Sequence, residues 1–117
     1  MKFEVKIINL SKEEITNLLS TALYGSPWWK VDNSTDEYKK AHGDTIEETL
    51  ADILLKGQKV ILIDMEEDEP YELTLDKLYN GLEMFIKNGG SINIEDYDLE
   101  EADSVLQYAV LGDVIWG

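Results

Sequence analysis

Three helix start signals constrain the fold of this chain more strongly than any other feature of its sequence. Each is a capping box, in which a serine, threonine or aspartate is followed three residues later by a glutamate, and the two side chains bind backbone amides of the first helical turn. The three boxes are Ser11 with Glu14, Thr45 with Glu48, and Asp98 with Glu101. Thr74 precedes a fourth segment with apolar residues at helical spacing. Four helices are therefore expected, over residues 11–25, 45–57, 74–89 and 98–112.

Short apolar segments between these helices predict strands. The run at residues 60–63 is continuous and rich in β-branched side chains, which is typical of a central strand covered on both faces. An acidic turn and Pro70 follow it, so residues 71–73 are expected to return antiparallel to it. The remaining expected strands are residues 3–8, 28–32 and 114–116. Residues 33–43 are polar and are predicted to form a loop, and residues 91–97 are predicted to be irregular.

These elements predict an α+β fold. A single domain over residues 1–117 is expected, with about four helices packed on a mixed or antiparallel sheet of four to five strands. A chain of 117 residues is long enough for one hydrophobic core. Gly81 lies inside the third expected helix, where glycine costs about 1 kcal/mol relative to alanine. Its presence predicts that another element, or a second subunit, packs close to that backbone.

The charge of the chain limits what it can bind. Twenty-five acidic residues oppose ten lysines, arginine is absent, and the formal net charge is −15. Binding to nucleic acid or to an anionic membrane requires positive charge, so neither is expected. The acidity either only keeps the protein in solution, or it forms a face that imitates nucleic acid and docks on a basic protein. Both interpretations stay open.

The sequence gives no support to a membrane protein, a secreted protein or a metal-dependent protein. No apolar run approaches the roughly 20 residues that span a bilayer, and residues 1–10 lack the continuous apolar segment of a signal peptide. Cysteine is absent, which excludes disulfides and thiolate metal sites, so a cytoplasmic location is expected. His42 is the only histidine, which rules out a catalytic triad and a histidine-rich metal centre. No catalytic residue, metal or cofactor is predicted.

Two clusters of acidic residues are candidates for binding. Hard cations such as calcium and magnesium prefer oxygen ligands, but neither cluster has the spacing of an EF-hand loop. A solvated face or turn is the simpler interpretation, and such a face is the candidate surface for a basic partner. Its residues are Glu66, Glu67, Asp68, Glu69, Asp96, Asp98 and Asp103.

A tryptophan doublet gives the strongest signal for a ligand site. Adjacent side chains on a strand face opposite ways, so one of Trp28 and Trp29 is expected in the core and the other partly exposed. Exposed tryptophan is common at binding hot spots and stacks on flat rings, although both indoles could instead pack in the core. Asp64 ends an apolar strand, where it either belongs to a site or caps the following turn. The candidate ligand-binding residues are Trp28, Trp29, Asp64, Gln107, Tyr108 and Trp116.

Three stretches of the chain resemble a widespread family of small acidic proteins that phages, prophages and other mobile elements encode, mostly without an assigned function. They are residues 21–29, residues 62–67 with 73–81, and residues 102–103 with 107–112 closing on Gly117. The first resembles that family's pattern of alanine-leucine, glycine and tyrosine-tryptophan, with Ser26 and Pro27 where glycine is more usual. The resemblance implies a phage-type accessory protein, and such proteins often antagonise host defence.

The leading hypothesis is a non-catalytic counter-defence protein that binds and neutralises an antiviral component of its host bacterium. In one mechanism, an oligomer sequesters a nucleotide immune signal, whose base stacks on the tryptophan doublet with polar contacts from Gln107 and Asp64. In the alternative, the acidic surface mimics nucleic acid and inhibits a nuclease such as a CRISPR effector. A metal-dependent phosphodiesterase using Asp64, Glu66 and Asp103 is a third hypothesis, and a structural or regulatory phage protein is a fourth.

Overall fold

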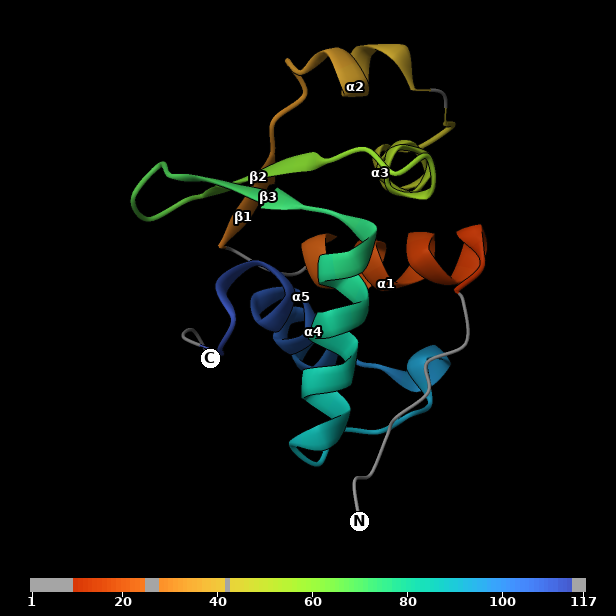
Figure 1. The fold of residues 1–117 in the computed structure, drawn as a ribbon, viewed down its shortest axis with the longest axis vertical. Coiled ribbons are helices and arrows are strands. Elements are labelled where there is room, and N and C mark those ends of the chain that lie inside the picture. The colour runs from red at the N-terminus through yellow and green to blue at the C-terminus, as the bar shows by residue number, and fades with distance from the viewer. Residues whose placement is uncertain (1–9, 25–27, 42, 115–117) are drawn as a thin grey trace.

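The structure, a computed structural model, describes residues 10–24, 28–41 and 43–114. Within these ranges it holds five α-helices, one short 3-10 helix and three strands (Figure 1). In chain order they are α1 (Lys12–Tyr24), β1 (Trp29–Val31), α2 (Asp36–Lys40), α3 (Ile46–Leu55), β2 (Val60–Asp64), β3 (Pro70–Leu73), α4 (Leu75–Lys87), η1 (Ile94–Asp96) and α5 (Leu99–Leu111). The α+β class is confirmed. The described residues hold one helix more and at least one strand fewer than predicted.

Helix α2 corrects the prediction of a loop over residues 33–43. The Thr35 side chain caps it by accepting a hydrogen bond of 3.2 Å from the backbone amide of Tyr38. Acidic residues occupy its first turn and lysines its last turn, and both placements suit the helix dipole. None of its five residues is buried, so this helix lacks the apolar period by which a longer helix is recognised.

The capping boxes begin three helices where the sequence predicts them. At α1, Ser11 and Glu14 exchange hydrogen bonds of 3.0 and 3.1 Å between side chain and backbone. Asp98 and Glu101 make the same exchange at α5. At α3 the Thr45 hydroxyl accepts from the Glu48 amide, whereas the Glu48 carboxylate accepts from the amide of Asp44 instead of that of Thr45. The local signal therefore fixes the helix starts even where its geometry varies.

The sheet is antiparallel, in the order β1-β2-β3, so β2 is central as predicted. Its burial alternates: Val60, Leu62 and Asp64 are buried, whereas Ile61 and Ile63 are half-buried. Complete cover of both faces was therefore the wrong expectation, because α1, α4 and α5 lie on one side of the sheet (Figure 1). The strands expected at residues 3–8 and 115–116 lie outside the described residues, and Val114 is not in a strand.

Gly81 marks the contact between α4 and α5. A Cβ atom at this position would lie 2.6 Å from the carbonyl oxygen of Val105 and 2.8 Å from the Cβ of Ala109. The prediction of a close backbone approach at Gly81 is confirmed, and the neighbour is α5 of the same chain. This packing fixes α5 against the core and thereby positions the polar side chains on it. The largest fully buried apolar side chains are Ile15, Leu19, Leu50, Ile53, Leu54, Leu62, Leu73, Leu78, Leu82, Val105 and Leu106.

Candidate binding site

Three polar or aromatic side chains meet where the start of β1 reaches α5, and we refer to Trp28, Asp103 and Gln107 as the polar junction. The indole Nε1 of Trp28 donates a hydrogen bond of 3.2 Å to Oδ2 of Asp103. The Nε2 of Gln107 donates one of 2.8 Å to the same oxygen. Asp103 and Gln107 stand four residues apart on α5, so the helix places them on one face.

Two more of the predicted ligand-binding residues lie beside the polar junction. Trp29 pairs with Asp64 across β1 and β2, and its ring meets that of Tyr71 edge to face, with centroids 5.9 Å apart. The backbone amide of Met65 donates to the carbonyl oxygen of Trp28. This bond connects the polar junction to the end of β2, where Asp64 lies. The fold therefore brings residues from three distant segments of the chain to one place.

Burial separates the two tryptophans. Trp29 is 6% exposed and belongs to the core, whereas Trp28 is half-buried, so the prediction that one of the pair is partly exposed is confirmed. Gln107 is fully buried at 0% exposure and Tyr108 is half-buried. Trp116 lies outside the described residues. Of the six predicted residues, Trp28 and Tyr108 are the described ones that border the surface.

Asp64 is buried at 4% exposure and supports a turn. Its Oδ1 accepts a hydrogen bond of 2.7 Å from the amide of Glu66, and its backbone bonds to Glu69 and Asp68. Asp68 adopts a left-handed conformation with φ 57°, which aspartate tolerates better than most residues. Of the two interpretations of Asp64, the structure supports the turn cap.

The turn that Asp64 holds carries Glu66, Glu67, Asp68 and Glu69 to the end of a projecting hairpin. Figure 1 shows the connection between β2 and β3 extending away from the helices. Six of the seven acids predicted to form a partner-binding surface are exposed, namely Glu66, Glu67, Asp68, Glu69, Asp96 and Asp98.

Asp103 is the exception and corrects the prediction. It is 8% exposed, because α5 turns it toward the core together with Gln107, and the indole of Trp28 lies against it. Its Oδ1 is buried and has no hydrogen-bond partner among the described residues. Buried carboxylate oxygens are normally hydrogen-bonded, so this one requires an explanation.

A groove that the sequence did not predict lies between α1 and η1. Its volume is about 600 Å³, within the range of ligand pockets. Carboxylates and apolar side chains share its lining, and no lysine or histidine is among the described residues that line it. The acidic members are Glu13, Glu14 and Glu95, and the apolar members are Leu18, Ile94 and Tyr97. The lining residues on α1 are more than 70 positions from those at and after η1, so only the packing of η1 on α1 reveals the site.

Burial, and secondly the carboxylate of Glu101, raise the pKa of the Tyr97 hydroxyl to about 12. Its hydroxyl donates a hydrogen bond to the carbonyl oxygen of Ser91. Both causes favour the neutral form of the tyrosine, so the apolar part of the groove adds no further negative charge at neutral pH.

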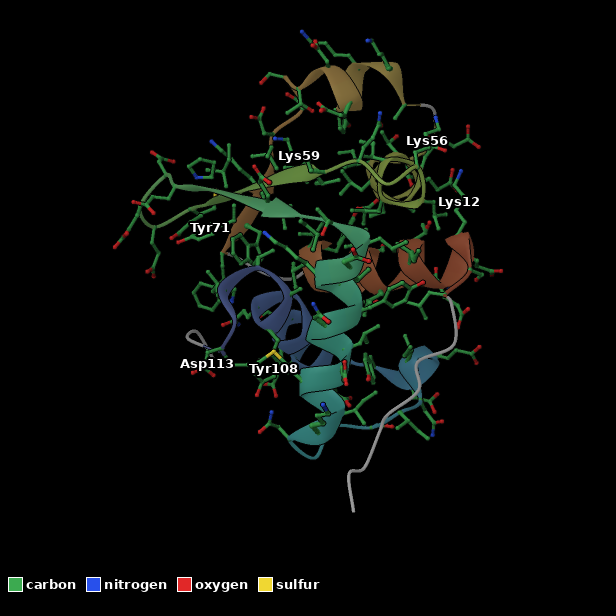
Figure 2. The ribbon with its side chains drawn as sticks, in the orientation of Figure 1. Lys12, Lys56, Lys59, Tyr71, Tyr108 and Asp113 are labelled. Carbon is green, nitrogen blue, oxygen red and sulfur yellow. The ribbon has the colours of Figure 1, made fainter. Side chains whose placement is uncertain are left out.

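Positive charge is unevenly distributed along the chain. Residues 88–117 contain no lysine but seven acids, which are Glu95, Asp96, Asp98, Glu100, Glu101, Asp103 and Asp113. The ion pairs among the described residues involve Lys56, Lys59 and Lys87. Figure 2 shows Lys56 and Lys59 toward α2 and α3, whereas Asp113 lies by the end of α5. The segment that forms η1 and α5 therefore contributes acidic side chains and no lysine to the surface.

The described residues give no geometric support to a metal centre. No group of three or more histidine, aspartate or glutamate side chains in the described ranges is arranged to hold a metal ion. Nor is any helix within those ranges long and apolar enough to span a bilayer. Comparison with models of known protein families, with curated proteins and with solved structures finds no match to this chain.

Proposed function

We propose that this protein is a non-catalytic inhibitor that binds a basic, nucleic-acid-binding protein of its host by presenting carboxylates in place of phosphates. The observation that carries the proposal is the groove between α1 and η1. Glu13, Glu14 and Glu95 line it, and Glu13 and Glu95 form no ion pair with any described residue. A concave surface with unpaired negative charge is complementary to projecting basic side chains.

The alternative mechanism, sequestration of a nucleotide signal, receives less support from the geometry. Gln107 has no exposed surface, and the carboxylate of Asp64 is occupied in a turn. The phosphates of a nucleotide would also approach a chain of net charge −15 that has no arginine. These facts favour a cationic partner over an anionic ligand.

The resemblance to phage-encoded proteins suggests which basic proteins are relevant. A host defence nuclease must carry a positive surface to bind its substrate, and that binding depends on release of counterions from phosphates. An acidic protein that occupies the same surface prevents the nuclease from binding nucleic acid. We therefore assign the protein to counter-defence, with a nuclease as the class of target.

A phage challenge tests this function. Bacteria that carry a nuclease-based defence system are infected with and without the gene, beside bacteria whose defence relies on a nucleotide signal. The expected result is restored plaque formation in the nuclease strains alone. Rescue confined to the nucleotide-signalling strains would instead support sequestration and contradict our proposal.

A pair of matched double variants tests the groove. Glu13→Gln with Glu95→Gln is expected to weaken inhibition of the purified target nuclease at least tenfold. Asp36→Asn with Asp76→Asn removes the same amount of charge from exposed positions in the first turns of α2 and α4 and should change inhibition much less. Equal losses for the two pairs would show that the net charge, and not the groove, is responsible. Inhibition should also weaken steeply between about 50 and 200 mM salt, because salt screens surface charge.

A further inference from the structure

We propose that the polar junction receives a single arginine side chain of the partner, with the guanidinium bound to Asp103 and stacked on Trp28. This inference rests on the proposed function and names the chemistry of one anchoring contact. It starts from Oδ1 of Asp103, a buried atom without a hydrogen-bond partner among the described residues, on a side chain that is 8% exposed. Leaving such an oxygen unpaired is unfavourable, and a donor that arrives with a ligand would satisfy it.

The described part of the chain does not supply a cation for Asp103. The ion pairs among the described residues are Lys56 with Asp52, Lys59 with Glu72 and Lys87 with Glu83, and all of them lie outside α5. The two neutral donors of the polar junction both bind Oδ2. The remaining oxygen is therefore the natural position for a charged donor from another molecule.

A guanidinium fits this position better than an ammonium. It is planar, it directs several N–H groups in one plane toward a carboxylate, and its face stacks on an aromatic ring. The Trp28 indole is held beside Asp103 by its own N–H group, so ring and carboxylate are already placed next to each other. Tryptophan and arginine are also the residues most often found at the energetic centre of protein interfaces.

Trp28 must move for the arginine to enter, because Oδ1 is closed to solvent in this structure. The indole is half-buried and therefore borders the surface. Its hydrogen bond to Asp103 is 3.2 Å long, compared with 2.8 Å for that of Gln107. The shorter bond keeps the carboxylate in place on α5, while the indole ring shifts and stays beside it as the stacking surface.

The test compares two peptides, nona-arginine and nona-lysine, by titration calorimetry on the purified protein. The wild type is expected to bind the arginine peptide at least tenfold more tightly. Asp103→Asn keeps the shape of the side chain and should reduce this preference to less than threefold. Glu100→Gln, at an exposed position on the same helix, is the matched control and should retain the preference. An unchanged preference in Asp103→Asn, or no preference in the wild type, would overturn the inference.

A second readout does not depend on the folding of Asp103→Asn. In a proton–nitrogen correlation spectrum, the indole signal of Trp28, assigned with Trp28→Phe, should shift with the arginine peptide and not with the lysine peptide. Guanosine is added separately, because the sequestration mechanism requires a base to stack on the tryptophan. A shift produced by guanosine and not by the arginine peptide would overturn the arginine assignment. Loss of nuclease inhibition in the groove variants, with no response of Trp28 to the arginine peptide, would leave the proposed function standing and refute only the anchor.

Discussion

Trp28 and Asp103 are 75 positions apart in the sequence and are joined by a hydrogen bond of 3.2 Å from the indole Nε1 to Oδ2. The bond links the segment before β1 to the middle of α5. Gln107 donates to the same oxygen, so one carboxylate oxygen accepts from one buried and one half-buried side chain. Asp103 was expected to be a surface acid, but it lies at the centre of the polar junction. The first prediction follows from this position.

Asp103→Ala is expected to lower the free energy of unfolding by about 1–3 kcal/mol, because two donors lose their shared acceptor inside the protein. Glu100→Ala, at an exposed position on the same helix, should change it by less than about 0.5 kcal/mol. Urea unfolding followed by circular dichroism measures both values. Equal stability of the two variants would mean that the polar junction contributes nothing to folding.

Gly81→Ala should destabilise the protein although alanine is the better helix former. The added Cβ would lie 2.6 Å from the carbonyl oxygen of Val105, so α4 and α5 must separate. The expected loss in the free energy of unfolding is about 1–3 kcal/mol. Asn80→Ala, at the exposed neighbouring position, is the control and should be neutral or slightly stabilising. A gain in stability for Gly81→Ala would contradict the observed packing.

Asp64→Ala should destabilise the hairpin by about 1 kcal/mol, since the amide of Glu66 loses its acceptor. Asp64→Asn keeps an acceptor oxygen and should retain most of that stability. Thermal unfolding and amide hydrogen exchange at residues 66–69 measure the difference. If Asp64→Asn proved as damaging as Asp64→Ala, the charge of Asp64 and not its hydrogen bond would be what matters.

The stability of the protein should depend on Tyr97 at high pH. Burial, followed by the Glu101 carboxylate, raises the pKa of Tyr97 from 10.0 to about 12 in the folded state. The unfolded chain therefore ionises first, so the contribution of Tyr97 is complete below about pH 10 and is lost as the pH rises toward 12. Tyr97→Phe cannot ionise there and should show a smaller loss over that interval. Urea midpoints at several pH values test this, and parallel curves would disprove it.

Replacing Glu66, Glu67, Asp68 and Glu69 by glutamine or asparagine should leave the fold intact, because all four side chains are exposed. Asparagine also suits the left-handed conformation at position 68. The free energy of unfolding is expected to stay within about 0.5 kcal/mol of wild type. If the hairpin contributes to the acidic surface, inhibition should weaken and its salt dependence should become shallower. Unchanged inhibition would confine the binding surface to the side of α1 and η1.

Local hydrogen bonds explain what the sequence determined by itself. The capping pairs at Ser11, Thr45 and Asp98 join residues three apart, so their effect does not depend on the rest of the fold. The hairpin of β2 and β3 was equally predictable from an apolar run followed by an acidic turn. Helix α2 was missed because its start signal, the cap at Thr35, is not followed by a buried stripe.

Tertiary packing decided which of the predicted site residues are buried and which of them meet. The sequence showed that one tryptophan of the doublet would be buried, but the register of β1 against β2 decided that it is Trp29. The packing of Trp28 and Gln107 on Asp103 decided that this acid is buried, while Asp98, the residue that caps α5, stays exposed. The groove exists only because η1 packs on α1. Burial and charge pairing depend on contacts between residues that are distant along the chain, and a pattern of spacing within a few residues carries no information about those contacts.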